Sequence, residues 1–470
     1  MKTTELAVIG AGPGGLSAAL TAAQAGVQVT LLDEYHHPGG QFLREAHREE
    51  RAPAISKTET RSRQLLEQLP SQNIDLRTGT LVWGIEGYRL ALYSEQETEW
   101  LSAEKIIIAA GARELASPFP GWTLPGVMTL GAAQILAKEH GVVPGKRILL
   151  AGSGPLLLAT AYAIGKSAQD IFVLGILEAT HPLSWMKYTL TVLGNLDRLL
   201  EGWHYAKSLF QKKIPYRVGY AILRAEGKEK LTGVTIARVN PQGKPIPGSE
   251  QQISLDTLCI GFGFVPNTEL TQLAGCVHEH IPERGGWVPQ TDETFQTSLP
   301  GVYAIGETAG VGGAKAALIQ GQIAGMAAAL DLGKLNKEEF ARRYLLLARQ
   351  LAPLKRFGAM LNTLFRPLPA FDDFITDDTN ICRCEQVRAG EIRQAIRDGA
   401  STLSDLKNWI PVGQGHCQGR TCGPLLARLI SNETGMPPGK IGQFRPRPPL
   451  KPIPVGSLAD LSTEEIDGQR

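Results

Sequence analysis

The fold of this chain is decided by residues 10–15, Gly10-Ala11-Gly12-Pro13-Gly14-Gly15. An apolar run at residues 5–9 precedes this turn and has the length of a buried strand. An alanine-rich helical pattern follows to about residue 25, and a second apolar run at 27–32 ends at Asp33-Glu34. Strand, glycine turn, helix, strand and acid in this order predict a complete β-α-β unit that binds a dinucleotide.

Each glycine of this turn has a mechanical reason. Gly10 makes the tight turn after the strand, and Gly12 lets the backbone approach a pyrophosphate at the helix N-terminus. Gly15 lets the helix pack closely on the strand. The carboxylate of Asp33 or of Glu34 then accepts hydrogen bonds from ribose hydroxyls. The turn therefore predicts a site for an ADP moiety.

Length and charge limit the class of protein. A chain of 470 residues is expected to form about two to four domains. The formal net charge of +2 gives no reason to expect nucleic acid or an anionic membrane as a partner. Glu5 interrupts the apolar start, and the turn at residues 152–155 interrupts the most apolar later stretch. We therefore expect a cytoplasmic protein that does not span a membrane.

A second strand, glycine turn and helix begins at Arg147, so the sequence predicts a second Rossmann-like domain nested in the first. Its turn reads Gly152-Ser153-Gly154-Pro155-Leu156-Leu157, and Leu157 stands where the third glycine belongs. A leucine at this position separates helix from strand where the motif needs its closest packing. Glu178 is a candidate ribose acid, so a weakened nucleotide site stays open. We favour a turn retained for architecture and do not expect NAD(P) there.

Four of the six cysteines lie within 41 residues, a spacing that indicates metal ligation in a reducing compartment and not a disulfide framework. Cys382 and Cys384 form one close pair, and Cys417 and Cys422 form the other. Four thiolates on two loops suit a [2Fe–2S] cluster. Zinc also accepts four cysteines, although its pairs are usually spaced by two to four residues. The other two cysteines are predicted core residues.

Three later segments resemble those of FAD/NAD(P)-dependent pyridine-nucleotide–disulfide-type oxidoreductases. They are Gly39-Gly40-Gln41, the strand-and-glycine run at residues 106–111, and residues 301–307 with the helix from about 312. The resemblance covers residues 1–330 and implies FAD on the first turn. The late motif of that family ends in Gly-Asp, whereas Gly306-Glu307 keeps the carboxylate one methylene longer. The implied cofactor-binding residues are Gly10, Ala11, Gly12, Pro13, Gly14, Gly15, Asp33, Glu34, Gly40, Gln41, Val82, Ala110, Gly111, Gly306 and Glu307.

The cysteine-bearing segment resembles the bacterioferritin-associated-ferredoxin-like [2Fe–2S] domain through Glu385-Gln386-Val387 and Gly423-Pro424. This resemblance favours iron over zinc and implies four cluster ligands. That domain more often spaces its second cysteine pair by two residues, whereas four residues separate Cys417 from Cys422. The implied ligands are Cys382, Cys384, Cys417 and Cys422.

Together, the degenerate second turn, the run Gly261-Phe262-Gly263-Phe264-Val265-Pro266-Asn267-Thr268 and the wider cysteine spacing resemble one subunit type. It is the larger flavoprotein subunit of heteromeric amine dehydrogenases, of the type found in opine oxidase, hydrogen cyanide synthase and hydroxyproline dehydrogenase. The resemblance spans nearly the whole chain. It implies an electron relay beside a partner flavoprotein of the glycine-oxidase type, which oxidises a Cα–N bond. A third small subunit, FMN at a subunit interface and ATP in place of FAD stay open.

We therefore expect an α/β chain of two nested Rossmann-like domains with a small C-terminal helical Fe–S domain. The implied substrate is an N-alkylated amino acid such as an opine or a proline derivative, and no residue is assigned a catalytic role. Two other functions stay open: a self-sufficient NAD(P)H-dependent flavin and Fe–S reductase, and a non-catalytic nucleotide-binding scaffold with zinc and ATP. The expected segments are 1–120 with 255–330 (FAD), 121–254 (degenerate NAD(P)-like), 331–375 (helical connector), 376–435 ([2Fe–2S]) and 436–470 (proline-rich basic tail).

Overall fold

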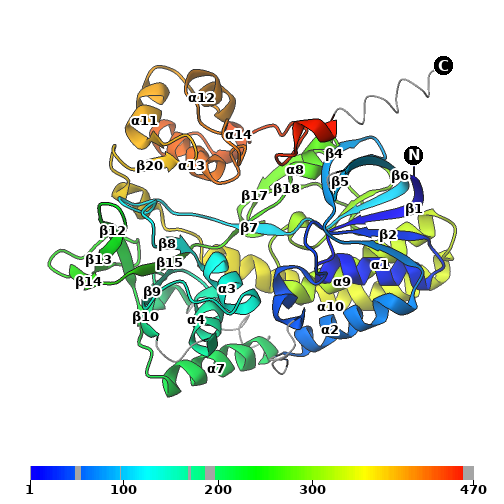
Figure 1. Cartoon of the computed structure of the whole chain (residues 1–470), viewed down its shortest axis with the longest axis horizontal. Helices are drawn as coiled ribbons and strands as arrows, with labels where there is room; N and C mark the ends of the chain where they lie inside the picture. The colour runs from blue at the N-terminus through cyan, green and yellow to red at the C-terminus, as the bar shows by residue number, and fades with distance from the viewer. Residues whose placement is uncertain are drawn as a thin grey trace. The chain divides into compact units, whose positions relative to one another are not determined.

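The computed structural model describes residues 2–47, 54, 56–95, 97–167, 171–185 and 196–458. The chain divides into two compact units, which we describe separately (Figure 1). Unit 1 contains Met1–Arg113, Val265–Ala359 and Arg445–Arg470, and unit 2 contains Glu114–Phe264 and Met360–Phe444. Each unit combines several of the five segments expected from the sequence. The boundaries of those segments therefore stay predictions.

Unit 1 is built on a sheet in the order β3-β2-β1-β6-β5-β4, with β19 paired to β6. The pairs among β1, β2, β3, β6 and β19 are parallel, whereas β4, β5 and β6 form an antiparallel meander. Leu6 and Val8 belong to one core cluster and Ala7 and Ile9 to another, because successive side chains of a strand point to opposite faces. The strands are β1 Lys2–Ile9, β2 Val29–Leu32, β3 Ile74–Arg77, β4 Leu81–Glu86, β5 Arg89–Ser94, β6 Glu97–Ile108 and β19 Val302–Ala304.

Helices α1, α2 and α9 cover one face of this sheet (Figure 1). Helices α1 and α9 approach closely, because a Cβ on Gly321 of α9 would lie 2.2 Å from the carbonyl oxygen of Gly14. The Ser17 hydroxyl of α1 also donates a 2.8 Å hydrogen bond to the Leu318 carbonyl. Helix α9 therefore fixes the position at which α1 begins. The helices of this unit are α1 Pro13–Gln24, α2 Lys57–Gln68, α8 Glu269–Leu273 and α9 Ala314–Asp331, and α10 Lys337–Leu364 continues into unit 2.

The described part of the proline-rich tail from residue 445 onward belongs to unit 1, whereas residues 436–444 belong to unit 2. The N–H of Leu450 donates a 2.9 Å hydrogen bond to the carbonyl of Trp83 in β4. The Leu450 side chain is buried in the same core cluster as Ala7 and Ile9. Lys451 forms an ion pair with Glu34 at the end of β2. The last segment of the chain thus completes a core that the first hundred or so residues begin.

Unit 2 is built on a parallel sheet in the order β11-β10-β9-β15-β8 and an antiparallel sheet in the order β12-β13-β14. Leu157, at the start of α4, is fully buried in a core cluster with residues of α3, β9 and β15. The elements are β8 Val127–Thr129, α3 Leu130–Glu139, β9 Arg147–Gly152, α4 Leu156–Ser167, β10 Phe172–Glu178, α5 Pro182–Trp185, α7 Leu196–Gln211, β11 Tyr216–Val218, β12 Tyr220–Gly227, β13 Leu231–Arg238, β14 Gln251–Ser254 and β15 Thr257–Gly261.

The cysteine-bearing segment of unit 2 is small and mostly helical. It contains β20 Asn380–Cys382, β21 Val387–Arg388, α11 Ala389–Arg397, α12 Leu403–Trp409, α13 Cys422–Thr434 and α14 Pro438–Ile441. The expected α/β fold with a small helical C-terminal domain is therefore confirmed. Within the described ranges, no helix has both the length and the apolar character that crossing a membrane requires.

Candidate cofactor sites

The first glycine turn is packed tightly at two glycines and open at the third. A Cβ on Gly10, which has φ +102°, would lie 2.4 Å from the Ala109 carbonyl oxygen. A Cβ on Gly15 would lie 1.8 Å from the Gly10 carbonyl oxygen, so both positions exclude any side chain. At Gly12, the N-cap of α1, a Cβ would meet no described atom within 4 Å beyond its chain neighbours. The structure thus leaves room at Gly12, where a helix N-terminus favours a phosphate.

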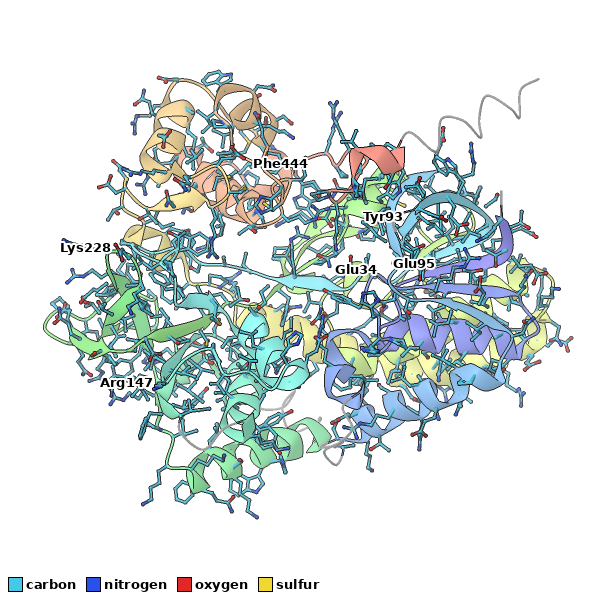
Figure 2. The ribbon with its side chains drawn as sticks, viewed as in Figure 1. Glu34, Tyr93, Glu95, Arg147, Lys228 and Phe444 are labelled. Carbon is cyan, nitrogen blue, oxygen red and sulfur yellow. The ribbon has the colours of Figure 1, made fainter. Side chains whose placement is uncertain are left out.

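The two acids at the end of β2 have different surroundings. Asp33 is buried and accepts a 2.6 Å hydrogen bond from the N–H of Ala11 and a 2.9 Å bond from the N–H of Tyr35. Burial raises the pKa of Asp33. Glu34 is exposed and pairs with Lys451 (Figure 2 marks Glu34). Asp33 therefore braces the turn, and its carboxylate keeps lone pairs for a further donor.

The loop at residues 39–41 lies against the first turn. The Gly39 N–H donates a 2.7 Å hydrogen bond to the Ala11 carbonyl, and a Cβ on Gly40 would lie 2.9 Å from the Cα of Gly12. Gln41 is exposed and accepts a 2.8 Å bond from Arg44. Val82, in β4, has its side chain in the apolar core with Ile9 and Leu32. The structure thus brings Gly40 to the turn and places Val82 in the core.

Asn267 holds the end of β6 in shape. Its side-chain amide donates a 2.9 Å hydrogen bond to the Ala110 carbonyl, and its backbone N–H donates a 3.0 Å bond to the Gly111 carbonyl. Arg113 in turn donates to the Asn267 side-chain oxygen at 2.9 Å. Gly111 has φ +73°, a backbone conformation that glycine adopts without strain. Residues 110 and 111 are therefore fixed by a polar network within unit 1.

Gly306-Glu307 lies beside the N-terminus of α9. The Glu307 carboxylate accepts a hydrogen bond from the N–H of Gly313, the N-cap of that helix, and burial raises its pKa. The N–H of Gly306 donates a 2.7 Å bond to the side chain of Gln320, which is buried in α9. Helix α9 thus holds both residues, and the N-termini of α1 and α9 belong to two helices packed on each other.

In the second glycine turn the acid is bound within the protein. Glu178 is 1% exposed and accepts the N–H groups of Gly154 at 3.0 Å and Thr180 at 2.9 Å. Tyr216 donates its hydroxyl to the same carboxylate at 3.4 Å. Burial raises the pKa of Glu178. Glu178 therefore differs from Asp33, because it accepts a hydrogen bond from the N–H of Gly154, the second glycine of its own turn.

The four clustered cysteines come together in unit 2. The sulfur of Cys384 lies 3.9 Å from that of Cys382 and 3.8 Å from that of Cys417. Cys422, at the start of α13, neighbours Cys382, and its side chain together with two backbone N–H groups lowers the pKa of Cys382 to about 5. The sulfurs thus follow one another as a series. Within the described ranges, no group of three or more histidine, cysteine or acidic side chains is arranged to hold a metal ion. Four neighbouring thiols match the number of cysteine ligands that a [2Fe–2S] cluster takes.

Glycines shape the loop that carries Cys417. A Cβ on Gly415 would lie 2.6 Å from the sulfur of Cys384, so this position excludes a side chain. The ring of Phe444 (Figure 2) fills the space over Gly413 and Gly419, where added Cβ atoms would lie 2.7 and 2.2 Å from its carbons. The loop is therefore held against both the thiols and the end of the cysteine-bearing segment.

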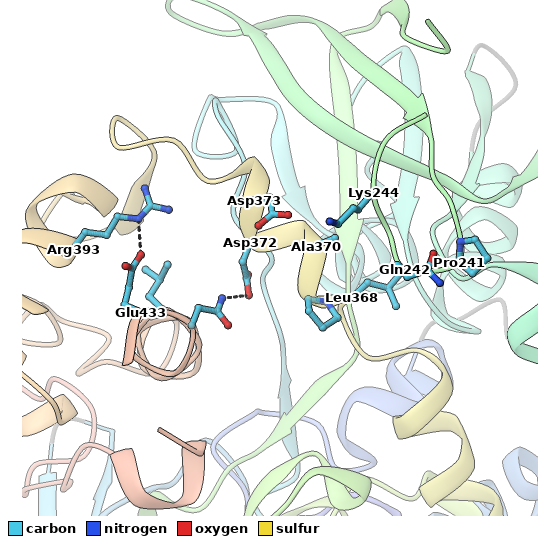
Figure 3. Close-up of a pocket in the computed structure, with 12 residues that line it drawn as sticks. Pro241, Gln242, Lys244, Leu368, Ala370, Asp372, Asp373, Arg393 and Glu433 are labelled. Carbon is cyan, nitrogen blue, oxygen red and sulfur yellow. Dashed lines mark hydrogen bonds and ion pairs between the residues drawn. The ribbon is translucent and has the colours of Figure 1, made fainter. Parts of the chain in front are cut away.

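A cavity of about 710 Å³ lies elsewhere in unit 2 (Figure 3). Three of its charged groups are engaged, since Asp372 accepts hydrogen bonds from Arg428 and Asn432, and Arg393 pairs with Glu433. No predicted cofactor residue lines it. Its walls are Pro241, Gln242, Lys244, Leu368, Pro369, Ala370, Asp372, Asp373, Arg393, Leu429, Asn432 and Glu433.

A family model described as pyridine nucleotide-disulphide oxidoreductase matches residues 4–338, well over half of the chain. The chain belongs to this oxidoreductase family. A second model, described as a BFD-like [2Fe-2S] binding domain, matches residues 380–432 of the same oxidoreductase. Family membership implies FAD or NAD(P) binding on the Rossmann-type part, and the second match implies a [2Fe–2S] site around the four thiols.

The oxidoreductase is similar to two curated proteins over nearly all its length. It is 32% identical to the A-type subunit of opine oxidase from Rhizobium meliloti, with 97% of this chain and 87% of the relative covered. It is 33% identical to hydrogen cyanide synthase subunit HcnB of Pseudomonas aeruginosa, with 97% and 98% covered. The crystal structure of L-proline dehydrogenase from P. horikoshii shares its fold, with a TM-score of 0.71, 20% identity, and 97% of this chain and 79% of that chain covered.

Sequence reasoning on this oxidoreductase missed two residues of the first site. Gln320 binds the Gly306 N–H from the middle of α9, and Asn267 binds residues 110 and 111. The sequence did single out the run that contains Asn267, but for its resemblance only. The available signal was a glutamine within a mostly apolar helix, because a polar group buried there needs a partner.

Proposed function

We propose that this chain is the electron-transfer flavoprotein subunit of a heteromeric amine dehydrogenase in the cytoplasm. The amine is an N-alkylated amino acid such as an opine or a proline derivative. A partner flavoprotein of the glycine-oxidase type oxidises its Cα–N bond, and this chain takes the electrons and delivers them to an external acceptor. One observation carries the proposal: an open dinucleotide turn at Gly12 and a four-thiol site occur in one chain that matches an opine oxidase component nearly end to end.

Residues of unit 1 would hold the flavin dinucleotide. Gly12 leaves space beside the first N–H groups of α1, which have no partner within the helix and would bind the pyrophosphate. Asp33 would accept a hydrogen bond from a ribose hydroxyl, since a carboxylate can accept more hydrogen bonds than the two that backbone N–H groups donate to it here. Glu307, held at the N-terminus of α9, would meet the ribityl chain. The proposed set is completed by Gly10, Ala11, Pro13, Gly14, Gly15, Glu34, Gly40, Gln41, Val82, Ala110, Gly111 and Gly306.

Cys382, Cys384, Cys417 and Cys422 would hold the [2Fe–2S] cluster. When bound, FAD would supply two-electron chemistry and the cluster one-electron chemistry, which together are what such a relay needs. The four thiols would bind iron as thiolates, so assembly of the cluster would release their protons. Three further options belong to this proposal: a third small subunit, FMN at a subunit interface, and ATP in place of FAD. Measuring the stoichiometry of the cofactors and of the subunits distinguishes them.

The test is purification of the chain with its partner, followed by flavin and iron quantitation. We expect about one FAD and about two irons per chain. Cys384→Ser should lose the iron and keep FAD, and Cys276→Ser, at a buried cysteine outside the cluster, should keep both. A colourless protein without iron would refute the relay. Full amine oxidation by the isolated chain would refute the partnership, and rapid flavin bleaching by NADH would favour a self-sufficient reductase.

A further inference from the structure

The second glycine turn is covered by its own chain. Phe365 follows directly after α10 and is 7% exposed. Atoms of its side chain lie 3.5 to 3.7 Å from the position that a Cβ on Gly154 would take. The Phe365 carbonyl accepts a 2.6 Å hydrogen bond from the buried hydroxyl of Ser153. Phe365 therefore contacts the turn both by apolar packing and by a hydrogen bond.

The first turn provides a comparison within the same chain. Gly12 and Gly154 hold the same place in their motifs, the second glycine, where the backbone must lie close to a pyrophosphate. At Gly12 an added Cβ would meet no described atom within 4 Å beyond its chain neighbours, whereas at Gly154 it would meet Phe365. One turn is open to a ligand and the other is filled.

A backbone N–H group of the second turn is also already hydrogen-bonded within the protein. The Gly154 N–H, one of the donors that the motif offers to a pyrophosphate, is bound by Glu178 at 3.0 Å. Asp33 leaves the corresponding Gly12 N–H alone, because it binds the N–H of Ala11. A nucleotide on the second turn would have to displace both a buried aromatic ring and a buried carboxylate.

We propose that Phe365 is an internal plug that closes the second Rossmann unit to NAD(P)H. Leu157, on which the sequence argument relied, lies in the core of unit 2, whereas Phe365 lies at the turn itself. Phe365 is thus the residue that determines specificity against nicotinamide donors. This inference goes beyond the proposed function and holds whichever amine or acceptor is used.

The experiment titrates ADP-ribose into the full chain by calorimetry, with excess FAD present to occupy the first turn. Phe365→Ala should bind about one equivalent with an affinity at least about tenfold above that of the unsubstituted chain. Phe365→Leu, which keeps apolar bulk over Gly154, should behave like the unsubstituted chain. Equal binding by the unsubstituted chain, or no gain in a folded Phe365→Ala variant, overturns the proposal.

A second measurement needs no variant. Hydrogen exchange of the unsubstituted chain is followed with FAD and then with NADH added. We expect FAD to protect residues 10–15 and NADH to leave residues 152–157 unchanged. Protection of residues 152–157 by NADH would overturn the plug even if Phe365→Ala failed to fold. Failure of FAD to protect residues 10–15 would count against the proposed function and not against the plug.

Discussion

Gly12 and Gly15 stand in one turn, but the structure gives them different tasks. Gly15 is required by packing, because the Gly10 carbonyl occupies the space of any side chain. Gly12 faces open space and has φ −71°, which any residue adopts. Gly15 serves the fold, and we infer that Gly12 serves the proposed cofactor, so matched alanine substitutions separate these tasks.

Gly12→Ala is expected to lower FAD content strongly and to change the free energy of unfolding of the FAD-free protein by less than about 1 kcal/mol. Gly15→Ala should destabilise the FAD-free protein by about 1–3 kcal/mol, because the helix must move away from the strand. Thermal unfolding and flavin absorbance measure both effects. Full flavin content in Gly12→Ala would contradict the assignment of Gly12 to the cofactor.

The raised pKa of Glu178 predicts how the stability of the chain depends on pH. Burial raises its pKa in the folded chain above the ordinary value of 4.5, so the folded state holds this proton more tightly than the unfolded state. The stabilising contribution is complete below the ordinary value and is lost as pH rises through the raised one. Relative to Glu178→Gln, the unsubstituted chain should therefore lose stability between about pH 5 and about pH 8.

Urea unfolding at the two pH values measures this difference. The exposed Glu250→Gln variant controls for the loss of one negative charge. A stability difference that grows in favour of the unsubstituted chain with rising pH would show that Glu178 is held as an anion.

At the scale of elements, α1 and α9 act as one block. Gly321 in α9 lies against the backbone of α1, and Gln320 beside it binds Gly306. The same helix contact positions both the first turn and Gly306-Glu307. A substitution between these helices should therefore affect both ends of the proposed FAD site.

Gly321→Ala is expected to destabilise the protein by about 1–3 kcal/mol and to weaken FAD binding, because its Cβ collides with the Gly14 carbonyl. Gly202→Ala in α7, where an added Cβ would meet no described atom within 4 Å, should instead stabilise the protein by about 0.5–1 kcal/mol. Chemical denaturation and FAD titration report the pair. Equal effects of the two substitutions would exclude the close helix contact.

Local pattern explains why the sequence predicted some features and not others. The fold was predicted correctly, because strand, turn and helix follow one another within some thirty residues. Phe365 and Ser153 are separated by 212 residues, and Leu450 is still farther from Trp83. Such contacts depend on tertiary packing, and no spacing rule reports them. The degenerate second turn was noticed through Leu157, but the residue that covers it was not.

At the scale of the whole molecule, the tail is a structural part of unit 1. Leu450→Ala should cost about 2–5 kcal/mol, since it removes a buried side chain from the core beside β4. Val455→Ala, at a side chain that is 82% exposed, should change stability by less than about 0.5 kcal/mol. Thermal unfolding of the full chain compares them. A Leu450→Ala variant as stable as Val455→Ala would show that the tail only rests on the surface.

The dependence of unit 1 on its tail has a consequence for biosynthesis. The first β-α-β unit leaves the ribosome early, but β19 and α9 follow some three hundred residues into the chain, and Leu450 arrives near the end. Until then the apolar faces of the first sheet have no complete cover. Nascent or prematurely terminated chains therefore present exposed apolar surface to chaperones and proteases. For the same reason, neither unit is encoded by one continuous stretch of gene that could be expressed alone.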